Sequence, residues 1–219
     1  MKSLDPVFER LGQNRLVAVL MIDEVDHAVP LARALLAGGV GAMELTLRTE
    51  AALPALERVA AEVPEMLVGA GTVLRADQVS SVVKAGAAFG VAPGTNETVL
   101  RAAREVGLPF APGIATASEI ETALEHDCRV LKVFPVGPLG GLPYLDILSS
   151  PYRHLGLRYI PLGGVDEGNF HDYAAVPEVL AVGGSWLAPP SQVAARDWDG
   201  IEARAAMAAE VVAGARSQR

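Results

Sequence analysis

A lysine interrupts an apolar run in the middle of the chain. The stretch RVLKVFPVG, residues 129–137, has the pattern of a buried strand, and Lys132 lies near its centre. The chain has only three lysines against fifteen arginines, so arginine supplies its ordinary positive charge. Lys2 is close to the N-terminus, and Lys84 falls at the end of a predicted helix, where cations are favoured. Neither explanation applies to Lys132.

Lys132 is therefore a candidate nucleophile. Burial disfavours the charged form of an amine, and a neutral amine can attack a carbonyl carbon to form a Schiff base. Arginine cannot do this because its guanidinium group stays protonated. The structural alternative is a lysine that pairs with a buried carboxylate or extends its ammonium group to the rim of the fold.

A second charged side chain, Glu44, lies in the strand-like run AMELTL, residues 42–47. Alternation along a strand places Glu44, Thr46 and Arg48 on one face and the apolar side chains on the other. A carboxylate beside a Schiff-base lysine can act as general acid and base. The structural alternative is an ion pair of Glu44 with Arg48 or Lys132.

Further candidates lie where predicted strands end. The guanidinium group of Arg48 can donate bidentate hydrogen bonds to a substrate carboxylate, and Thr72 can donate one more from its hydroxyl group. A surface charge and a strand-end cap are the ordinary roles of such residues. Pro93 and Phe134 would form the walls of a site, although core packing is the default interpretation for both.

Two Gly-Gly pairs follow the last two predicted strands, in PLGGV (residues 161–165) and VGGSW (residues 182–186). Glycine lets backbone N–H groups approach an anion closely. Phosphate sites in (β/α)8 barrels use the loops after strands seven and eight. The two pairs together therefore indicate a phosphate site, whereas either pair alone would indicate only a turn.

Short apolar runs alternate with longer helix-patterned stretches about eight times. Strands are predicted at residues 16–21, 41–47, 66–72, 87–94, 108–114, 129–135, 157–164 and 179–186. Helices are predicted at residues 26–37, 51–62, 76–85, 97–106, 116–126 and 201–215. This order favours an α/β fold, a (β/α)8 TIM barrel with a short N-terminal helix. An open doubly wound sheet is the alternative, but its GxGxxG fingerprint is absent.

Composition narrows the classes of protein. A chain of 219 residues, half hydrophobic and a fifth charged, fits a single compact domain over residues 1–219. A net charge of −8 argues against a general nucleic-acid binder, and no apolar run reaches the roughly 18 residues of a membrane span. Cys128 is the sole cysteine, which excludes an internal disulfide and a cysteine-cluster metal site. The N-terminus lacks the pattern of a signal peptide, so we expect a cytoplasmic protein.

The motifs MELTLRT, VGAGTV, APG, LKVFP, LGGV and VGGSWL resemble, in this order, those of the KDPG/KHG aldolase family. KDPG is 2-keto-3-deoxy-6-phosphogluconate and KHG is 4-hydroxy-2-oxoglutarate. The resemblance extends from about residue 16 to residue 189. It implies a (β/α)8 barrel, no metal or organic cofactor, and a homotrimer. It also implies class I cleavage of KDPG, a phosphorylated 2-keto acid, to pyruvate and D-glyceraldehyde 3-phosphate, and of KHG to pyruvate and glyoxylate.

The same resemblance assigns roles to residues. The Schiff-base lysine would be Lys132, and the proton shuttle, acting through water, would be Glu44. The pyruvate-side carboxylate would be bound or lined by Arg48, Thr72, Pro93 and Phe134. The phosphate would be bound by Gly163, Gly164, Gly184 and Ser185.

Two positions depart from the family pattern. Members that cleave KDPG usually have threonine before the Gly-Gly pair of strand seven, where this chain has Leu162. An aliphatic residue there resembles relatives acting on the galactonate epimer, KDPGal, and removes a hydroxyl group that could recognise the substrate. The motifs TLRT and GGSW, in contrast, resemble the KDPG type. The second departure is FPVG after the lysine, where the family often has FPAE.

Two further hypotheses come from other functional classes. A phosphate-binding barrel could be an isomerase or epimerase that uses Glu44 as a base without a covalent step. A barrel could also bind a phosphorylated metabolite without converting it, although binding alone does not need a buried amine.

Overall fold

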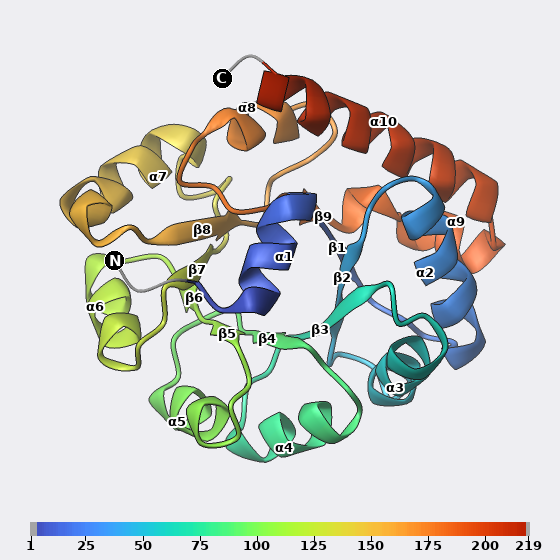
Figure 1. Cartoon of the computed structure of the whole chain (residues 1–219), viewed down its shortest axis with the longest axis horizontal. Helices are drawn as coiled ribbons and strands as arrows, with labels where there is room; N and C mark the ends of the chain where they lie inside the picture. The colour runs from blue at the N-terminus through green and yellow to red at the C-terminus, as the bar shows by residue number, and fades with distance from the viewer. Residues whose placement is uncertain (1–3, 218–219) are drawn as a thin grey trace.

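The computed structural model describes residues 4–217, so Lys2 lies outside the described residues. Helices surround a curled layer of parallel strands, and the short helix α1 (Pro6–Asn14) lies across the centre of that layer in Figure 1. The predicted α/β class and the predicted N-terminal helix are therefore confirmed. None of the helices within residues 4–217 is both long and apolar enough to cross a membrane.

The strands form two hydrogen-bonded groups. The larger group has the order β5-β4-β3-β2-β1-β9, and the smaller has the order β6-β7-β8. The strands are β1 Leu16–Leu20, β2 Ala42–Thr46, β3 Leu67–Gly71, β4 Phe89–Val91, β5 Phe110–Ala111, β6 Gly113–Ile114, β7 Val130–Val133, β8 Arg158–Pro161 and β9 Val182–Gly184. Neighbouring strands pair in parallel in both groups.

Short connections join the two groups at both edges. Only Pro112 separates β5 from β6, so the single strand predicted at residues 108–114 is two short strands. Proline has no N–H to donate to a neighbouring strand, which explains the interruption. At the other edge, the backbone N–H of Leu180 donates to the carbonyl oxygen of Tyr159 at 2.8 Å, next to a parallel bridge between Tyr159 and Val179.

The helices follow the strands in sequence. They are α2 Ala28–Ala37, α3 Ala52–Glu62, α4 Ala76–Lys84, α5 Glu97–Glu105, α6 Ala117–Glu125, α7 Gly141–Ser149, α8 Phe170–Ala175, α9 Pro190–Ala195 and α10 Trp198–Ser217. Three 3-10 turns are η1 Val25–His27, η2 Ser150–Leu155 and η3 Ser185–Leu187. Thr116 caps α6, because its hydroxyl accepts a hydrogen bond from the N–H of Glu119 while the Glu119 carboxylate accepts one from the N–H of Thr116.

Helix α7 is the main element that the sequence pattern missed. It begins at Gly141, after Gly140, and both glycines have positive φ. Glycine and Pro143 at the start of a segment indicate a loop rather than a helix. Packing overrides this weak local preference, because Leu145 is buried in the core. Helix α9, Pro190–Ala195, is likewise absent from the predicted helices.

The strands separate two layers of apolar side chains. Met43 and Leu45 of β2 belong to the layer that packs against the outer helices. The inner layer lies within the curl of the sheet and includes Phe8 and Leu11 of α1. Helix α1 ends two residues before β1 begins, so it covers the amino-terminal ends of the strands. The carboxyl ends are left for polar side chains.

Candidate active site

Lys132 and Glu44 meet inside the curl of the sheet. Lys132 is on β7 and Glu44 is on β2, and the ammonium nitrogen Nζ lies 3.2 Å from the carboxylate oxygen Oε1. The side chains are only 7% and 1% exposed, respectively. The Nζ atom also lies 5.4 Å from the centre of the Phe134 ring, within the range of a cation–π contact. Strand alternation thus predicted the facing side chains correctly.

A cavity of about 390 Å³ opens beside this pair, at the carboxyl ends of the strands. The predicted site residues that line it are Arg48, Lys132, Phe134, Leu162, Gly163, Gly164, Gly184 and Ser185. Glu44, whose carboxylate contacts the amine of Lys132, does not line the cavity. The volume suits a small metabolite. Lys132 and Arg48 add an amine and a guanidinium group to the lining.

A larger cavity of about 710 Å³ lies elsewhere, between η2 and the starts of β7 and β8. Its lining contains arginine and tyrosine side chains but none of the predicted site residues. Size alone would favour this cavity. The smaller one is the candidate active site because its lining contains Lys132, the buried amine that the sequence indicates to be a candidate nucleophile.

Two predicted substrate contacts, Thr72 and Pro93, do not line the candidate active site. Thr72 is half-buried and follows Gly71 with a positive φ of 58°. Pro93 borders a separate hollow of about 220 Å³ between the loops that follow β3 and β4. Both residues lie at carboxyl ends of strands, as expected, and their roles toward a substrate stay predictions.

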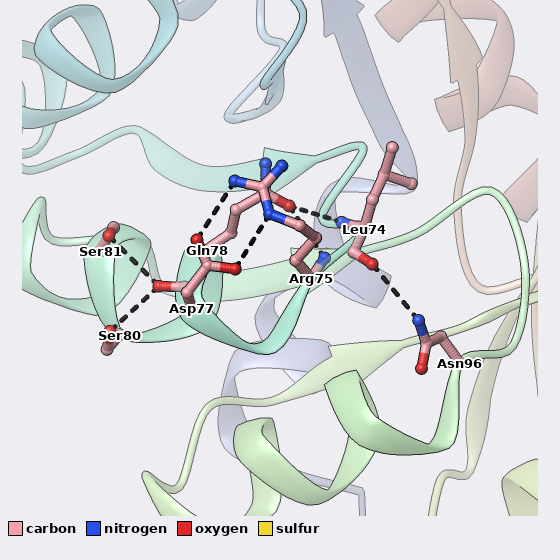
Figure 2. A network of polar contacts seen from close by, with 7 residues as sticks. All are labelled: Leu74, Arg75, Asp77, Gln78, Ser80, Ser81 and Asn96. Carbon is pink, nitrogen blue, oxygen red and sulfur yellow. Dashed lines mark hydrogen bonds and ion pairs between the residues drawn. The ribbon is translucent and has the colours of Figure 1, made fainter.

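A network of polar contacts joins the loops that carry Thr72 and Pro93 (Figure 2). The side-chain oxygen of Gln78 accepts hydrogen bonds from the backbone N–H groups of Leu74 and Arg75 at 2.8 and 3.0 Å. The side-chain amide of Asn96 donates to the carbonyl oxygen of Leu74 at 3.3 Å. These contacts tie the loop after β3 to the loop after β4, beside the hollow of about 220 Å³ that Leu74 and Asn96 help to line.

The Gly-Gly loop after β8 approaches the loop after β7 closely. Gly163 and Gly164 have φ values of 78° and 99°, which side-chain-bearing residues rarely adopt. The N–H of Gly137 donates to the carbonyl oxygen of Gly163 at 2.8 Å, and a Cβ atom on Gly164 would lie 2.7 Å from the Cα of Gly137. Gly137 is the last residue of the unusual FPVG motif, so one of the loop contacts of that motif is glycine against glycine.

Three residues near the site had no predicted role. Asn169 holds the loop after β8, because its side-chain amide donates to the carbonyl oxygen of Gly164 at 2.9 Å. Thr46 lines the cavity and donates its hydroxyl to the carbonyl oxygen of Leu20 at 3.0 Å. Gly71 lies directly against Glu44. Alternation had placed Thr46 on the inward face, but nothing in the sequence indicated the contacts of Asn169 or Gly71.

Within residues 4–217, no group of three or more histidine, cysteine, aspartate or glutamate side chains could hold a metal ion. The ionisable side chains that line the cavity are Lys132 and the exposed Arg48, and Glu44 contacts Lys132. One buried amine, one carboxylate and one guanidinium group are a set that can hold and activate a keto acid.

Comparisons with known proteins agree with this chemistry. The family model for KDPG and KHG aldolase matches residues 7–204. The 2-dehydro-3-deoxy-phosphogluconate aldolase of Dickeya dadantii is 44% identical over 205 residues, 94% of each chain. The KHG/KDPG aldolase of Escherichia coli is 42% identical over 206 residues, also 94% of each chain.

A solved structure is similar over nearly the whole chain. It is a KDPG aldolase from Legionella pneumophila in which pyruvate is captured as a covalent carbinolamine intermediate at low pH. Its TM-score to this chain is 0.88 at 34% sequence identity, and the match covers 93% of this chain and 98% of that one.

Proposed function

Because the chain belongs to the KDPG and KHG aldolase family, we propose that it cleaves KDPG to pyruvate and D-glyceraldehyde 3-phosphate through a Schiff base on Lys132. Members of this family are carbon–carbon lyases, and this chain is one of them. The observation that carries the proposal is the buried contact of 3.2 Å between Lys132 and Glu44, at the edge of a cavity of metabolite size.

The cavity lining supports one orientation of the substrate. Arg48 would bind the carboxylate at the pyruvate end, with Thr72 beside it. The backbone at Gly163, Gly164 and Ser185 would bind the phosphate at the other end. Lys132 is part of the same lining, and the C2 carbonyl carbon of the bound keto acid would face its amine. Phe134 and Pro93 would pack beside the carbon chain.

The proposed reaction begins when the neutral amine of Lys132 attacks C2 and forms a carbinolamine. Loss of water, with a proton delivered from Glu44 through a water molecule, gives the iminium ion. Glu44 then accepts, through water, the proton of the C4 hydroxyl. The C3–C4 bond breaks, its electron pair enters the iminium group, and the aldehyde leaves. Protonation of the resulting enamine at C3 and hydrolysis of the iminium ion release pyruvate and restore the amine.

The same residues support cleavage of KHG, since the chemistry at C2 to C4 does not involve the phosphate. KDPGal is the alternative phosphorylated substrate, and one observation favours it. Leu162 is 3% exposed and lines the cavity where the KDPG pattern has threonine. No side-chain hydroxyl is available at that position to distinguish the epimers.

We also infer a closed (β/α)8 barrel for the single domain 1–219. The inference is supported by hydrogen bonds at both junctions of the strand groups, from the N–H of Lys132 to the carbonyl oxygen of Pro112 and from Leu180 to Tyr159, each of 2.8 Å. Counted together, β5 and β6 form one barrel strand. The family resemblance supports a homotrimer, and sedimentation analysis would test this assembly. It also supports a cytoplasmic enzyme that needs no cofactor and releases pyruvate.

Borohydride trapping with pyruvate tests the function. Reduction should leave one pyruvate-derived adduct, and peptide mapping should place it on Lys132. Lys84, exposed at the end of α4, is the internal control within the same protein. Cleavage of KDPG to pyruvate should accompany the adduct. Folded protein that forms no adduct would refute the Schiff base. Isomerised product would then indicate a non-covalent isomerase, and binding without conversion would indicate a binding protein.

A further inference from the structure

Beyond Leu67, strand β3 has no side-chain bulk on its inward face. Leu67 belongs to the inner core layer, and alternation places Gly69 and Gly71 on the same face. Side chains from neighbouring strands occupy the space that these glycines leave. The ring of Phe89 lies against Gly69, and the carboxylate of Glu44 lies against Gly71.

The contact between Gly71 and Glu44 leaves no room for a methyl group. A Cβ atom on Gly71 would lie 2.0 Å from Oε1 of Glu44 and 2.6 Å from its Cδ and Cγ atoms. Non-bonded carbon and oxygen atoms do not approach so closely, so the carboxylate would have to move. Oε1 is also the atom that lies 3.2 Å from Nζ of Lys132. One oxygen atom is therefore held between Gly71 and the amine.

Backbone conformation does not explain this glycine. Gly71 is not among the glycines with positive φ, whereas Thr72, the next residue, has a φ of 58° without being glycine. The carbonyl oxygen of Gly71 accepts a hydrogen bond from the N–H of Leu47 at 2.9 Å, so β3 is tied to β2 at this point. Space for the Glu44 carboxylate is the remaining reason for glycine here.

We propose that Gly71 is a positioning residue for the reaction. Because Gly71 has no side chain, the Glu44 carboxylate can lie in the space above its Cα atom and contact Lys132. The role rests on the proposed function, in which Glu44 moves protons to and from the substrate bound to Lys132. Any side chain at position 71 displaces Oε1 from the amine and disturbs proton transfer, while Lys132 itself remains free to react.

Gly71→Ala separates these two steps. Exchange of the methyl hydrogens of pyruvate with deuterated water reports proton transfer at C3, and endpoint borohydride trapping reports the reactive lysine. We expect Gly71→Ala to slow the exchange by about 100-fold and to leave the trapped adduct on Lys132. The matched control is Gly69→Ala, whose Cβ atom would lie 2.3 Å from the Phe89 ring on the same strand face. It should lower stability without a selective loss of exchange.

A double-mutant cycle identifies Glu44 as the residue through which Gly71 acts. Glu44→Ala removes the carboxylate, so adding Gly71→Ala should lower neither the exchange rate nor the melting temperature further. Gly71→Ala alone should lower the melting temperature by several degrees. Wild-type exchange in Gly71→Ala, or additive losses in the double variant, would overturn the proposal. Wild-type protein that formed no adduct would overturn the aldolase function, whereas the melting temperatures would still decide whether Gly71 seats Glu44.

Discussion

Nζ of Lys132 and Oε1 of Glu44 lie 3.2 Å apart in the core, although 88 residues separate them in sequence. A buried charge without a partner is costly, and the pair offsets part of that cost for both side chains. In the proposed reaction the iminium ion would carry its positive charge on the same nitrogen atom. Glu44 would then lie beside a cation within the Schiff base, which would couple the stability of the site to its chemistry.

Glu44→Gln should remove most of the activity and keep the nucleophile. Glutamine has the same shape as glutamate but cannot take up and return a proton, so we expect kcat for cleavage to fall by about 10²- to 10⁴-fold. Endpoint trapping with pyruvate should still label Lys132. Glu57→Gln, on the exposed surface of α3, is the control and should behave as wild type. Near-normal kcat in Glu44→Gln would assign the proton transfers to another group.

Leu162 should control the choice between epimers. A hydroxyl group placed there can hydrogen-bond the substrate, so we expect Leu162→Thr to raise kcat/KM for KDPG relative to KDPGal by about tenfold or more. Leu162→Val is the matched control, because valine has the shape of threonine without the hydroxyl group. Both variants remove bulk from a buried position and should lose about 1–3 kcal/mol of unfolding free energy. If both variants changed the ratio of kcat/KM for KDPG to that for KDPGal equally, the volume of the side chain at position 162, and not a hydroxyl group, would determine selectivity.

The contact between Lys132 and Glu44 could be predicted because its signals are local. Lys132 is unusual for its residue type within an apolar strand, and Glu44 lies on the polar face that alternation gives its own strand. Parallel strands with buried faces then leave few places where both can lie. The Gly-Gly loops were likewise visible, because glycine at a strand end indicates a special backbone conformation or a close approach, as at Gly164.

Other features depend on contacts between distant segments. Gly71 resembles any strand glycine until the Glu44 carboxylate is placed against it. Asn169 could be an ordinary loop residue until its hydrogen bond to Gly164 is seen. Helix α7 has glycine and proline at its start and forms because its apolar residues pack on the core. Periodicity and residue type carry no information about such partners.

Gly164 should control the preference for phosphorylated substrates. Alanine at φ 99° is strained, and its Cβ atom would lie 2.7 Å from the Cα of Gly137, so the loop that would bind phosphate must move. We expect Gly164→Ala to lower kcat/KM for KDPG by about tenfold or more and to change kcat/KM for KHG, which has no phosphate, much less.

Gly107→Ala controls for backbone strain in that comparison. Gly107 has a φ of 69°, nothing lies within 4 Å of its would-be Cβ atom, and it is remote from the cavity. The Gly107→Ala variant should be less stable than wild type, but its ratio of kcat/KM for KDPG to kcat/KM for KHG should be unchanged. If Gly164→Ala lowered kcat/KM equally for KDPG and KHG, the loop would shape the whole site instead of selecting phosphate.

Two acidic groups, the thiol of the half-buried Cys128 and the hydroxyl of the buried Tyr159, should make the fold sensitive to alkali. Burial, with a smaller effect of the Asp127 carboxylate, raises the pKa of the Cys128 thiol to about 12. Burial, with a smaller effect of Glu178, also raises the pKa of the Tyr159 hydroxyl to about 12. In the unfolded chain such groups ionise near pH 8.5 and 10, at about their ordinary pKa values. The unfolded state therefore binds fewer protons above about pH 9, and the free energy of unfolding should fall as the pH rises toward 12.

Urea unfolding at pH 8, 9, 10 and 11 measures this dependence. Both groups are almost fully neutral in both states near pH 7, so they should add little slope there. Cys128→Ser removes the thiol, and the serine hydroxyl does not ionise in this range. Its stability should fall less steeply between pH 9 and 10, by at most about 1.4 kcal/mol per pH unit. An unchanged slope in Cys128→Ser would mean that the thiol ionises alike in the folded and unfolded chains, and that its burial does not resist the loss of its proton.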